Sequence, residues 1–249
     1  MVIRPRAAAS IALAMLAACR TSTPPDAIDS ALSARVPAAT IALAGLDLDR
    51  LRPSPLYANL PPAALAFLQP FDDARHVLIA WSGGELLAIA RGVVPGATQL
   101  APDIALSGAP NLIAAAAAAH PPAQILGPAG SVAGAAPVWI AIRGGIALPL
   151  EGNLANLNKL LHDTEFVTLG VQPGDPSDFQ LAAHCPSPET ALRFEQSLRA
   201  IVSLAIATVA RQPGTAGLLQ SIRIQRDDRV VQVSLSAAPD VLLKLLLPG

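Results

Sequence analysis

One stretch in the first third of the chain is typical of a β-hairpin that lies deep inside a fold. Two apolar segments, HVLIAW at 76–81 and ELLAIAR at 85–91, flank a glycine pair, Gly83-Gly84. Adjacent glycines supply the positive φ angles of a two-residue hairpin turn, which sets Ile79 opposite Ala88. Because both faces of this ribbon are apolar, we expect it at the centre of a sheet, with protein on both sides.

A second hairpin is predicted near the C-terminus, and its pattern differs. Apolar and polar residues alternate in SIRIQ at 221–225 and VVQVSLS at 230–236. A turn centred on Asp227-Asp228 would set Ile224 opposite Val231. One-sided alternation is typical of an outer, half-solvated strand pair.

The best helix signal is Ser187-Pro188-Glu189, which combines a capping residue, a first-turn proline and an acid near the positive end of the helix dipole. This helix is predicted to run to Arg211, with Glu195 and Arg199 paired four residues apart. Shorter helices are expected over 112–119, 154–161 and 241–247. The sequence therefore predicts an α+β fold of antiparallel hairpins with helices packed on them.

The chain also contains a weak internal echo. TIALAGLDLDRLRPSPLYANL at 40–60 resembles VWIAIRGGIALPLEGNLANL at 138–157, and each segment precedes a strand pair. We therefore expect two weakly related lobes, 40–120 and 137–249. The Pro-, Gly- and Ala-rich stretch 121–136 is the expected connector between them.

Composition limits the kinds of partner. The formal net charge is −1, which argues against a nucleic-acid-binding protein with its basic patch. Charged residues make up only 14% of the chain, against the roughly 25% of ordinary soluble domains. A chain so poor in charge has either a large core or apolar patches that meet a partner.

The N-terminus carries an export pattern. Arg4 and Arg6 precede a short apolar run that ends in Leu16-Ala17-Ala18-Cys19. This ending resembles the lipobox of bacterial lipoproteins. The resemblance covers residues 1–19 only, and no family is recognised for the rest of the chain.

The resemblance implies a signal peptide over 1–18, cleavage before Cys19, and acylation of that cysteine. Residues 19–39 would then form the lipidated cysteine and a flexible tether. Arg20 stands where inner-membrane lipoproteins commonly have aspartate. The resemblance therefore implies a place in the cell envelope, at the periplasmic face of the outer membrane.

No segment carries a convincing catalytic or cofactor signature: a P-loop, a G-x-G-x-x-G turn after a strand and an H-E-x-x-H motif are all missing from the sequence. We predict no catalytic residue, no metal site and no cofactor. Asp47 and Asp49 are the polar pair most worth testing for a bound ion. Cys185, the second of two cysteines, is expected to be a buried structural thiol.

These observations favour a non-enzymatic, lipid-anchored envelope protein that binds or scaffolds. Two alternatives stay open: an envelope hydrolase whose site is assembled in space, and a carrier of an apolar ligand. Partners would be the membrane, through the lipid, and a protein or a second copy of the chain. The expected protein-binding surface lies on residues 200–210 of the long helix, which have almost no polar face, and on the helix at 241–247, whose one charge is Lys244. Its expected residues are Ile201, Val202, Leu204, Ile206, Val209, Leu243, Leu246 and Leu247.

Overall fold

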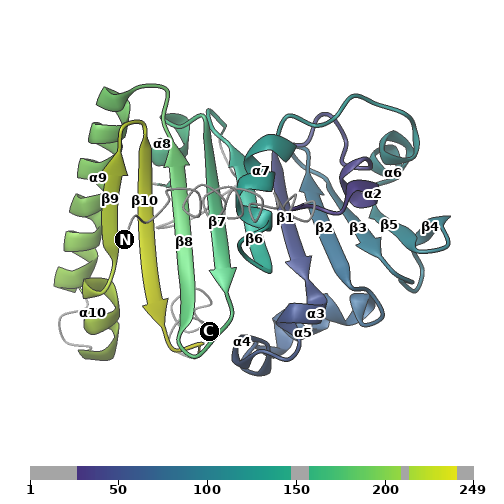
Figure 1. Ribbon diagram of the computed structural model, residues 1–249, viewed down its shortest axis with the longest axis horizontal. Coiled ribbons are helices and arrows are strands. Elements are labelled where there is room, and N and C mark those ends of the chain that lie inside the picture. Colours follow the sequence, from purple (N-terminus) through teal and green to yellow (C-terminus); the bar gives the residue numbers. More distant parts are fainter. Residues whose placement is uncertain (1–26, 147–156, 209–212, 240–249) are drawn as a thin grey trace, which may run out of the picture.

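The computed structural model describes residues 27–146, 157–208 and 213–239. Their strands form one ten-stranded sheet, and every pairing in it is antiparallel (Figure 1). The strands are β1 (Ala42–Asp47), β2 (His76–Trp81), β3 (Leu86–Arg91), β4 (Thr98–Ala101), β5 (Ile104–Gly108), β6 (Val138–Arg143), β7 (Phe166–Gln172), β8 (Ser177–His184), β9 (Arg223–Asp227) and β10 (Val230–Ala237). Their order across the sheet is β4-β5-β3-β2-β1-β6-β7-β8-β10-β9.

Helices lie on both faces of the sheet, and an α+β fold is thereby confirmed. They are α2 (Ser30–Ser33), α3 (Leu48–Leu51), α4 (Pro55–Ala58), α5 (Pro62–Leu68), the 3₁₀ turn η1 (Gln69–Phe71), α6 (Pro110–Ala117), α7 (Leu126–Ala133), α8 (Leu157–His162), α9 (Pro188–Thr208) and α10 (Pro213–Gln220).

The two faces of the sheet have different covers. On one face, α2, α6 and α7 pack over a core that includes Leu43, Ile89 and Trp139. We call this the α7 face. On the other, the α9 face, α3 to α5 cover one half of the sheet through Leu48 and its neighbours, and α9 covers the other half through Phe194 and its neighbours.

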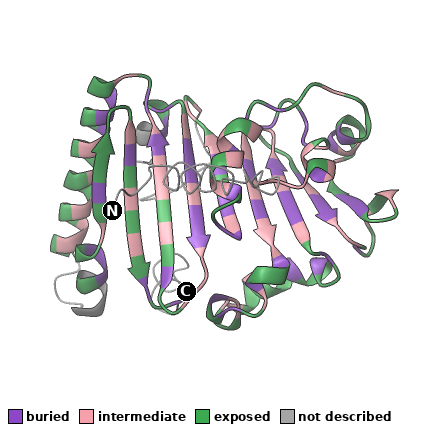
Figure 2. Cartoon of the chain, viewed as in Figure 1, coloured by how far each residue is buried: buried purple, intermediate pink, exposed green. Residues whose placement is uncertain are grey.

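The register of the first predicted hairpin is confirmed, but its predicted place at the centre of the sheet is not, because the β1–β6 pair occupies the middle of the strand order. Ile79 pairs with Ala88, and the hairpin of β2 and β3 lies inside the sheet. Gly83 has a φ of +86°, the positive value that the turn needs. Burial on both faces of these strands is evident in Figure 2.

The second predicted hairpin forms at the sheet edge as expected, but its predicted register is wrong. Ile224 pairs with Val233, two positions from the expected Val231. The turn centres on Asp228-Arg229, because Asp228 takes the positive φ of 47°. A slip of two residues keeps every side chain on its expected face, so the alternating pattern could not detect it.

The predicted connector and part of the predicted tether are wrong, because both are folded. Residues 126–133 of the expected connector form α7, whose Ala129 and Ala133 are buried against the sheet. The expected tether reached residue 39, yet Leu32 and Val36 are completely buried. Asp29 caps α2 by accepting a hydrogen bond from the Ala31 backbone N–H at 2.9 Å.

The two predicted lobes share one sheet, and a core on each of its faces contains residues of both lobes. Strands β1 and β6 come from the two echoing segments, and they pair side by side in the middle of the sheet. The core on the α7 face joins Leu43 and Ile89 of the first half to Trp139 and Ala141 of the second. Residue 137 therefore marks no break in the packing.

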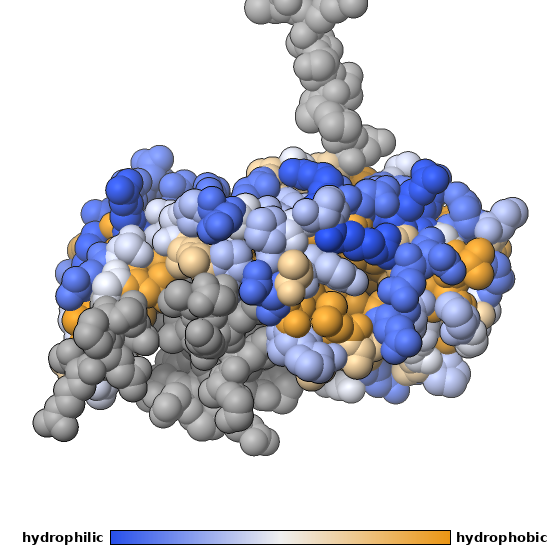
Figure 3. All heavy atoms as spheres, turned by 90° about the horizontal axis from the view of Figure 1, so that it is seen from below, coloured by the Kyte–Doolittle hydropathy of each residue, from blue (hydrophilic) through white to orange (hydrophobic). Residues whose placement is uncertain are grey.

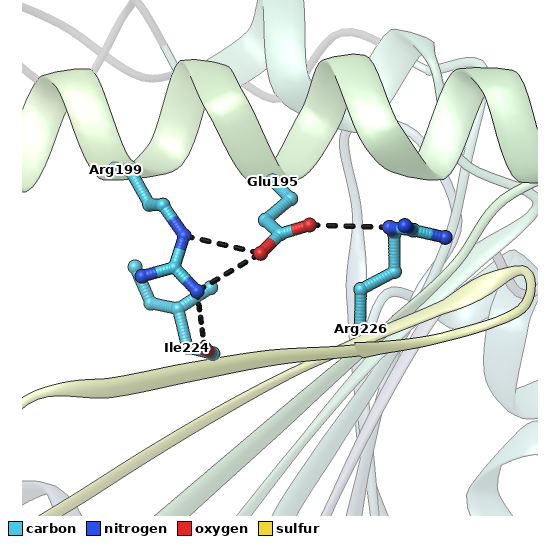
Figure 4. A network of polar contacts seen from close by, with 4 residues as sticks. All are labelled: Glu195, Arg199, Ile224 and Arg226. Atoms are coloured by element: carbon cyan, nitrogen blue, oxygen red, sulfur yellow. Dashed lines mark hydrogen bonds and ion pairs between the residues drawn. The ribbon is translucent and has the colours of Figure 1, made fainter.

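Helix α9 begins where the sequence predicted, and the Ser187 hydroxyl accepts a hydrogen bond from the Thr190 backbone N–H at 3.2 Å. Side chains of the helix also reach β9, the edge strand (Figure 4). Arg199 donates to the Ile224 carbonyl at 2.7 Å, and Glu195 binds both Arg199 and Arg226. This bond makes the Ile224 carbonyl unavailable to a further strand at that position.

Replacing Glu195 with glutamine is expected to cost about 1 kcal/mol of unfolding free energy at pH 7. The hydrogen bond from Arg199, and then that from Arg226, lowers the pKa of Glu195 below its usual 4.5. The stabilisation is therefore present above that pH and lost as the pH falls through the lower folded-state pKa. Urea unfolding at pH 7 and pH 3 measures it.

Glu165→Gln is the matched control, because Glu165 has no ion pair within the described residues. The loss of unfolding free energy in E195Q should be smaller at pH 3 than at pH 7. E165Q should show no loss of unfolding free energy at pH 7. A deficit of the same size at both pH values would contradict the role of the Glu195 charge.

Candidate functional site

The predicted protein-binding surface is partly visible on α9. Ile201 and Leu204 are exposed, at 42% and 68%, while Val202 is half-buried against the core beneath the helix and Ile206 is half-buried. The remaining predicted residues, Val209, Leu243, Leu246 and Leu247, lie outside the described residues.

The exposed residues Ile201 and Leu204 lie in the half of α9 that carries no charge. Ala191 and Phe194 bury one stripe of the helix against β8 and β10, and Leu198 continues it. From Ala200 to Ala207 the sequence AIVSLAIA carries no charge on any side. Its outward residues therefore present small and aliphatic groups to whatever lies beside the helix. In the view of Figure 3, hydrophobic residues reach the surface in several places between hydrophilic ones.

Cys185 is buried, as expected, with 1% of its surface exposed. Burial raises the pKa of its thiol, and the nearby Asp163 and Glu165 add to the rise. A raised pKa leaves less of the nucleophilic thiolate at neutral pH.

His184 precedes Cys185 in the chain, so its side chain points to the opposite face of the sheet. Its ring stacks on Phe166 with centroids 4.0 Å apart, and burial lowers its pKa. The two side chains do not form a thiol–imidazole pair.

The proposed ion-binding pair does not assemble. Asp47 ends β1 and caps α3, accepting a hydrogen bond from the Arg50 backbone N–H at 3.1 Å, and its carboxylate lies 3.8 Å from His76 Nε2. Asp49 sits in the first turn of α3 instead of continuing the strand. Among the described residues, no three His, Cys, Asp or Glu side chains are placed to hold a metal ion.

A hollow on the α7 face, lined by both polar and apolar residues, was not predicted from the sequence. It has a volume of about 370 Å³ and lies between α7 and the outer strands. One wall of the hollow is formed by Ser131, Val132 and Ala135, and the strands beneath contribute Thr168 and Ala182. The other side chains on this face are polar or charged: Gln180, His184, Arg223, Gln225, Gln232 and Ser234.

A second hollow of about 400 Å³ continues the first along the strands. The two share Gln180, Arg223 and Ser234, and the second adds Asp178, Ser221 and Ser236. We call the two together the outer-strand trough. The alternating Gln and Ser residues were the available sequence signal, but such alternation is also typical of a solvated face.

No helix in the described part of the chain has the length and apolar character needed to cross a membrane. No family model matches the sequence, and no curated protein matches it either. The fold is similar to that of TP0453 in its crystal form III, with a TM-score of 0.52 and 9% sequence identity. That match covers 88% of this chain and 98% of TP0453. Crystal form I of TP0453 gives a TM-score of 0.49, also at 9% identity. The similarity extends over nearly the whole of TP0453, and at this identity it shows a shared fold.

Proposed function

We propose that the protein is a lipid-anchored envelope protein that works by binding or scaffolding and not by catalysis. The observation that carries this proposal is the exposed, uncharged half of α9, where Leu204 is 68% exposed and Ile201 is 42% exposed. Exposed apolar surface is costly in water, and a contiguous patch of it typically marks a contact with another macromolecule.

The N-terminal sequence supports the anchoring part of the proposal. Leu16-Ala17-Ala18-Cys19 resembles a lipobox, and Arg20 is not the aspartate of inner-membrane lipoproteins. Several acyl chains on Cys19 would anchor the protein stably, where a single chain would not. The folded part would then stand at the periplasmic face of the outer membrane, within reach of envelope proteins or of a second copy.

We further propose that the two halves of the sheet arose by duplication of an ancestral unit. The strand order on either side of the central β1–β6 pair supports this: each of these strands is followed by helical turns and then by an antiparallel pair, β2–β3 or β7–β8. The echo between 40–60 and 138–157 falls on the two central strands.

The binding proposal is tested by placing a photo-cross-linking amino acid at position 204 in envelopes of cells that make the full chain. Position 196, an exposed glutamine on the same helix, is the control. We expect position 204 to give a discrete cross-linked product, with a second copy or another envelope protein, and position 196 to give none. Absence of a product at 204, or equal products at both positions, would refute the α9 surface.

Leu204→Ser is expected to abolish that partner contact while leaving the fold intact. An exposed side chain contributes little to folding, so the unfolding free energy should change by less than about 0.5 kcal/mol. Thermal unfolding measures the stability, and a photo-cross-linker at the neighbouring Ile201 measures the contact. Unchanged cross-linking from Ile201 in the L204S chain would contradict the prediction.

A further inference from the structure

The outer-strand trough holds a set of long polar side chains that have no partner. Within the described residues, the side chains of Gln180, Arg223, Gln225 and Gln232 make no hydrogen bond or ion pair. By contrast, the arginines on the opposite face of this strand region, Arg199 and Arg226, are bound by Glu195. The polar groups of the trough are thus available to a ligand.

Strand register places these side chains in two rows. Gln180 pairs with Ser234, which pairs with Arg223, and in the next row Gln232 pairs with Gln225. Neighbouring strands lie about 4.8 Å apart, so the first row extends about 10 Å from β8 to β9. The rows lie about 7 Å apart, two residues along the strand. An array of this size suits a chain of several polar units.

The charge and hydrogen-bonding capacity of the trough define the ligand class. The residues that line the hollow between α7 and the outer strands include one arginine, Arg223, and no Asp, Glu or Lys. A guanidinium binds carboxylate in a bidentate fashion. Each glutamine amide both donates and accepts, as is needed to bind a hydroxyl or an N-acetyl group. Asp178 lies one row from Arg223, beside Ser236, and makes no ion pair with it.

His184 supplies a flat surface at the other end of the trough. It lies four residues along β8 from Gln180, about 13 Å away at 3.3 Å per residue. The stack on Phe166 holds its ring in place. Burial lowers the pKa of His184, which favours the neutral form of the ring. A neutral, fixed ring can pack against the apolar face of a sugar.

We propose that the outer-strand trough binds a carboxylate-bearing saccharide chain. The amide rows hydrogen-bond the hydroxyl or N-acetyl groups, and Arg223 pairs with the carboxylate. A peptide that adds a strand would need the free edge of β9, where Arg199 of α9 already occupies the Ile224 carbonyl. An apolar ligand would leave the amides and the guanidinium desolvated without partners.

The test uses the full chain, purified in mild detergent, and fluorescence anisotropy of four end-labelled probes. Two are acidic saccharides, a galacturonic acid hexamer and a tetrasaccharide of alternating N-acetylglucosamine and N-acetylmuramic acid, which separate a uronate source from a cell-wall source. The other two are neutral chitotetraose and the acidic peptide pentaglutamate. We expect at least one of the two acidic saccharides to bind at least tenfold more tightly than chitotetraose and pentaglutamate.

Variants localise the binding. Arg223→Gln should weaken acidic saccharide binding about tenfold or more, and Gln232→Ala should weaken it severalfold. Arg75→Gln, which removes an equal charge outside the trough, should leave it unchanged. Thermal unfolding checks that each variant is folded.

Equal binding of the neutral and acidic saccharides, tighter binding of pentaglutamate, no binding at millimolar concentration, or wild-type affinity in R223Q would each overturn the proposal. The inference rests on the proposed binding role but concerns different residues. If the saccharides do not bind at the trough but position 204 still gives its cross-linked product, this inference is refuted and the proposed function is not.

Discussion

Replacing Cys19 with serine is expected to release the protein from the membrane fraction. The lipobox-like ending Leu16-Ala17-Ala18-Cys19 implies that the Cys19 thiol is the acceptor of a diacylglyceryl group. A serine hydroxyl does not form the thioether, so the chain would lose every acyl chain at once. Each buried methylene is worth about 0.8 kcal/mol, so the loss of several chains changes partitioning by orders of magnitude.

Incorporation of labelled palmitate and the intact mass of the mature N-terminus measure this effect. Cys185→Ser is the matched control: it makes the same chemical change at a buried position remote from the signal, and should leave palmitate incorporation unchanged. An unmodified Cys19 in the wild-type protein, or cleavage at another position, would contradict the anchoring proposal.

Replacing Gly45 with alanine is expected to lower the melting temperature by roughly 6–12 °C, for a destabilisation of about 3 kcal/mol. Gly45 lies on β1 beneath the indole of Trp139, to which it is paired across the central strands. A Cβ atom at position 45 would stand 2.2 Å from two indole carbons. Trp139 is 6% exposed, so the ring cannot move aside without disturbing the core.

Gly130→Ala in α7 is the control for that variant, because nothing lies within 4 Å of a Cβ atom built there. In a helix interior the same substitution gains up to about 1 kcal/mol of helix propensity. Differential scanning calorimetry should therefore show opposite shifts for G45A and G130A. An unchanged melting temperature in G45A would mean that Trp139 does not pack on Gly45 as described.

The elements predicted correctly were those whose local chemistry permits one structure. The hairpin at 76–91 combines a glycine-pair turn with strands apolar on both faces, so its register and its burial on both faces could be predicted. Ser187 with its following proline fixed the start of α9. In both cases the deciding interactions lie within a few residues of one another.

The missed elements depend on packing between distant residues. Helix α7 is rich in Gly, Pro and Ala, and its composition is typical of a connector. Its small residues instead permit a close approach to the sheet, where Val132 and Ala136 lie against Gly170. Strands β4 and β5 were not predicted, because β4 has only four residues and their ladder contains a bulge.

The candidate sites divide in the same way. The exposed apolar residues on α9 could be predicted from its uncharged second half, which is a local pattern. The outer-strand trough is made by side chains of α7, β7, β8, β9 and β10. Its polar residues are unremarkable one strand at a time, and the sheet order that collects them was not predictable from any one segment.

The central pairing of β1 with β6 has a consequence for the order in which the chain folds. Ala42 pairs on one side with Trp81 of β2, the next strand along the chain. On its other side it pairs with Ile142 of β6, a hundred positions later. Contacts between residues so far apart carry a large loop-closure cost and slow the search for the native state. The β2–β3 hairpin can form early, but β1 keeps one unsatisfied edge until residue 143 has joined it. During that interval the half-formed sheet exposes an unpaired strand at its middle, which another chain could pair with.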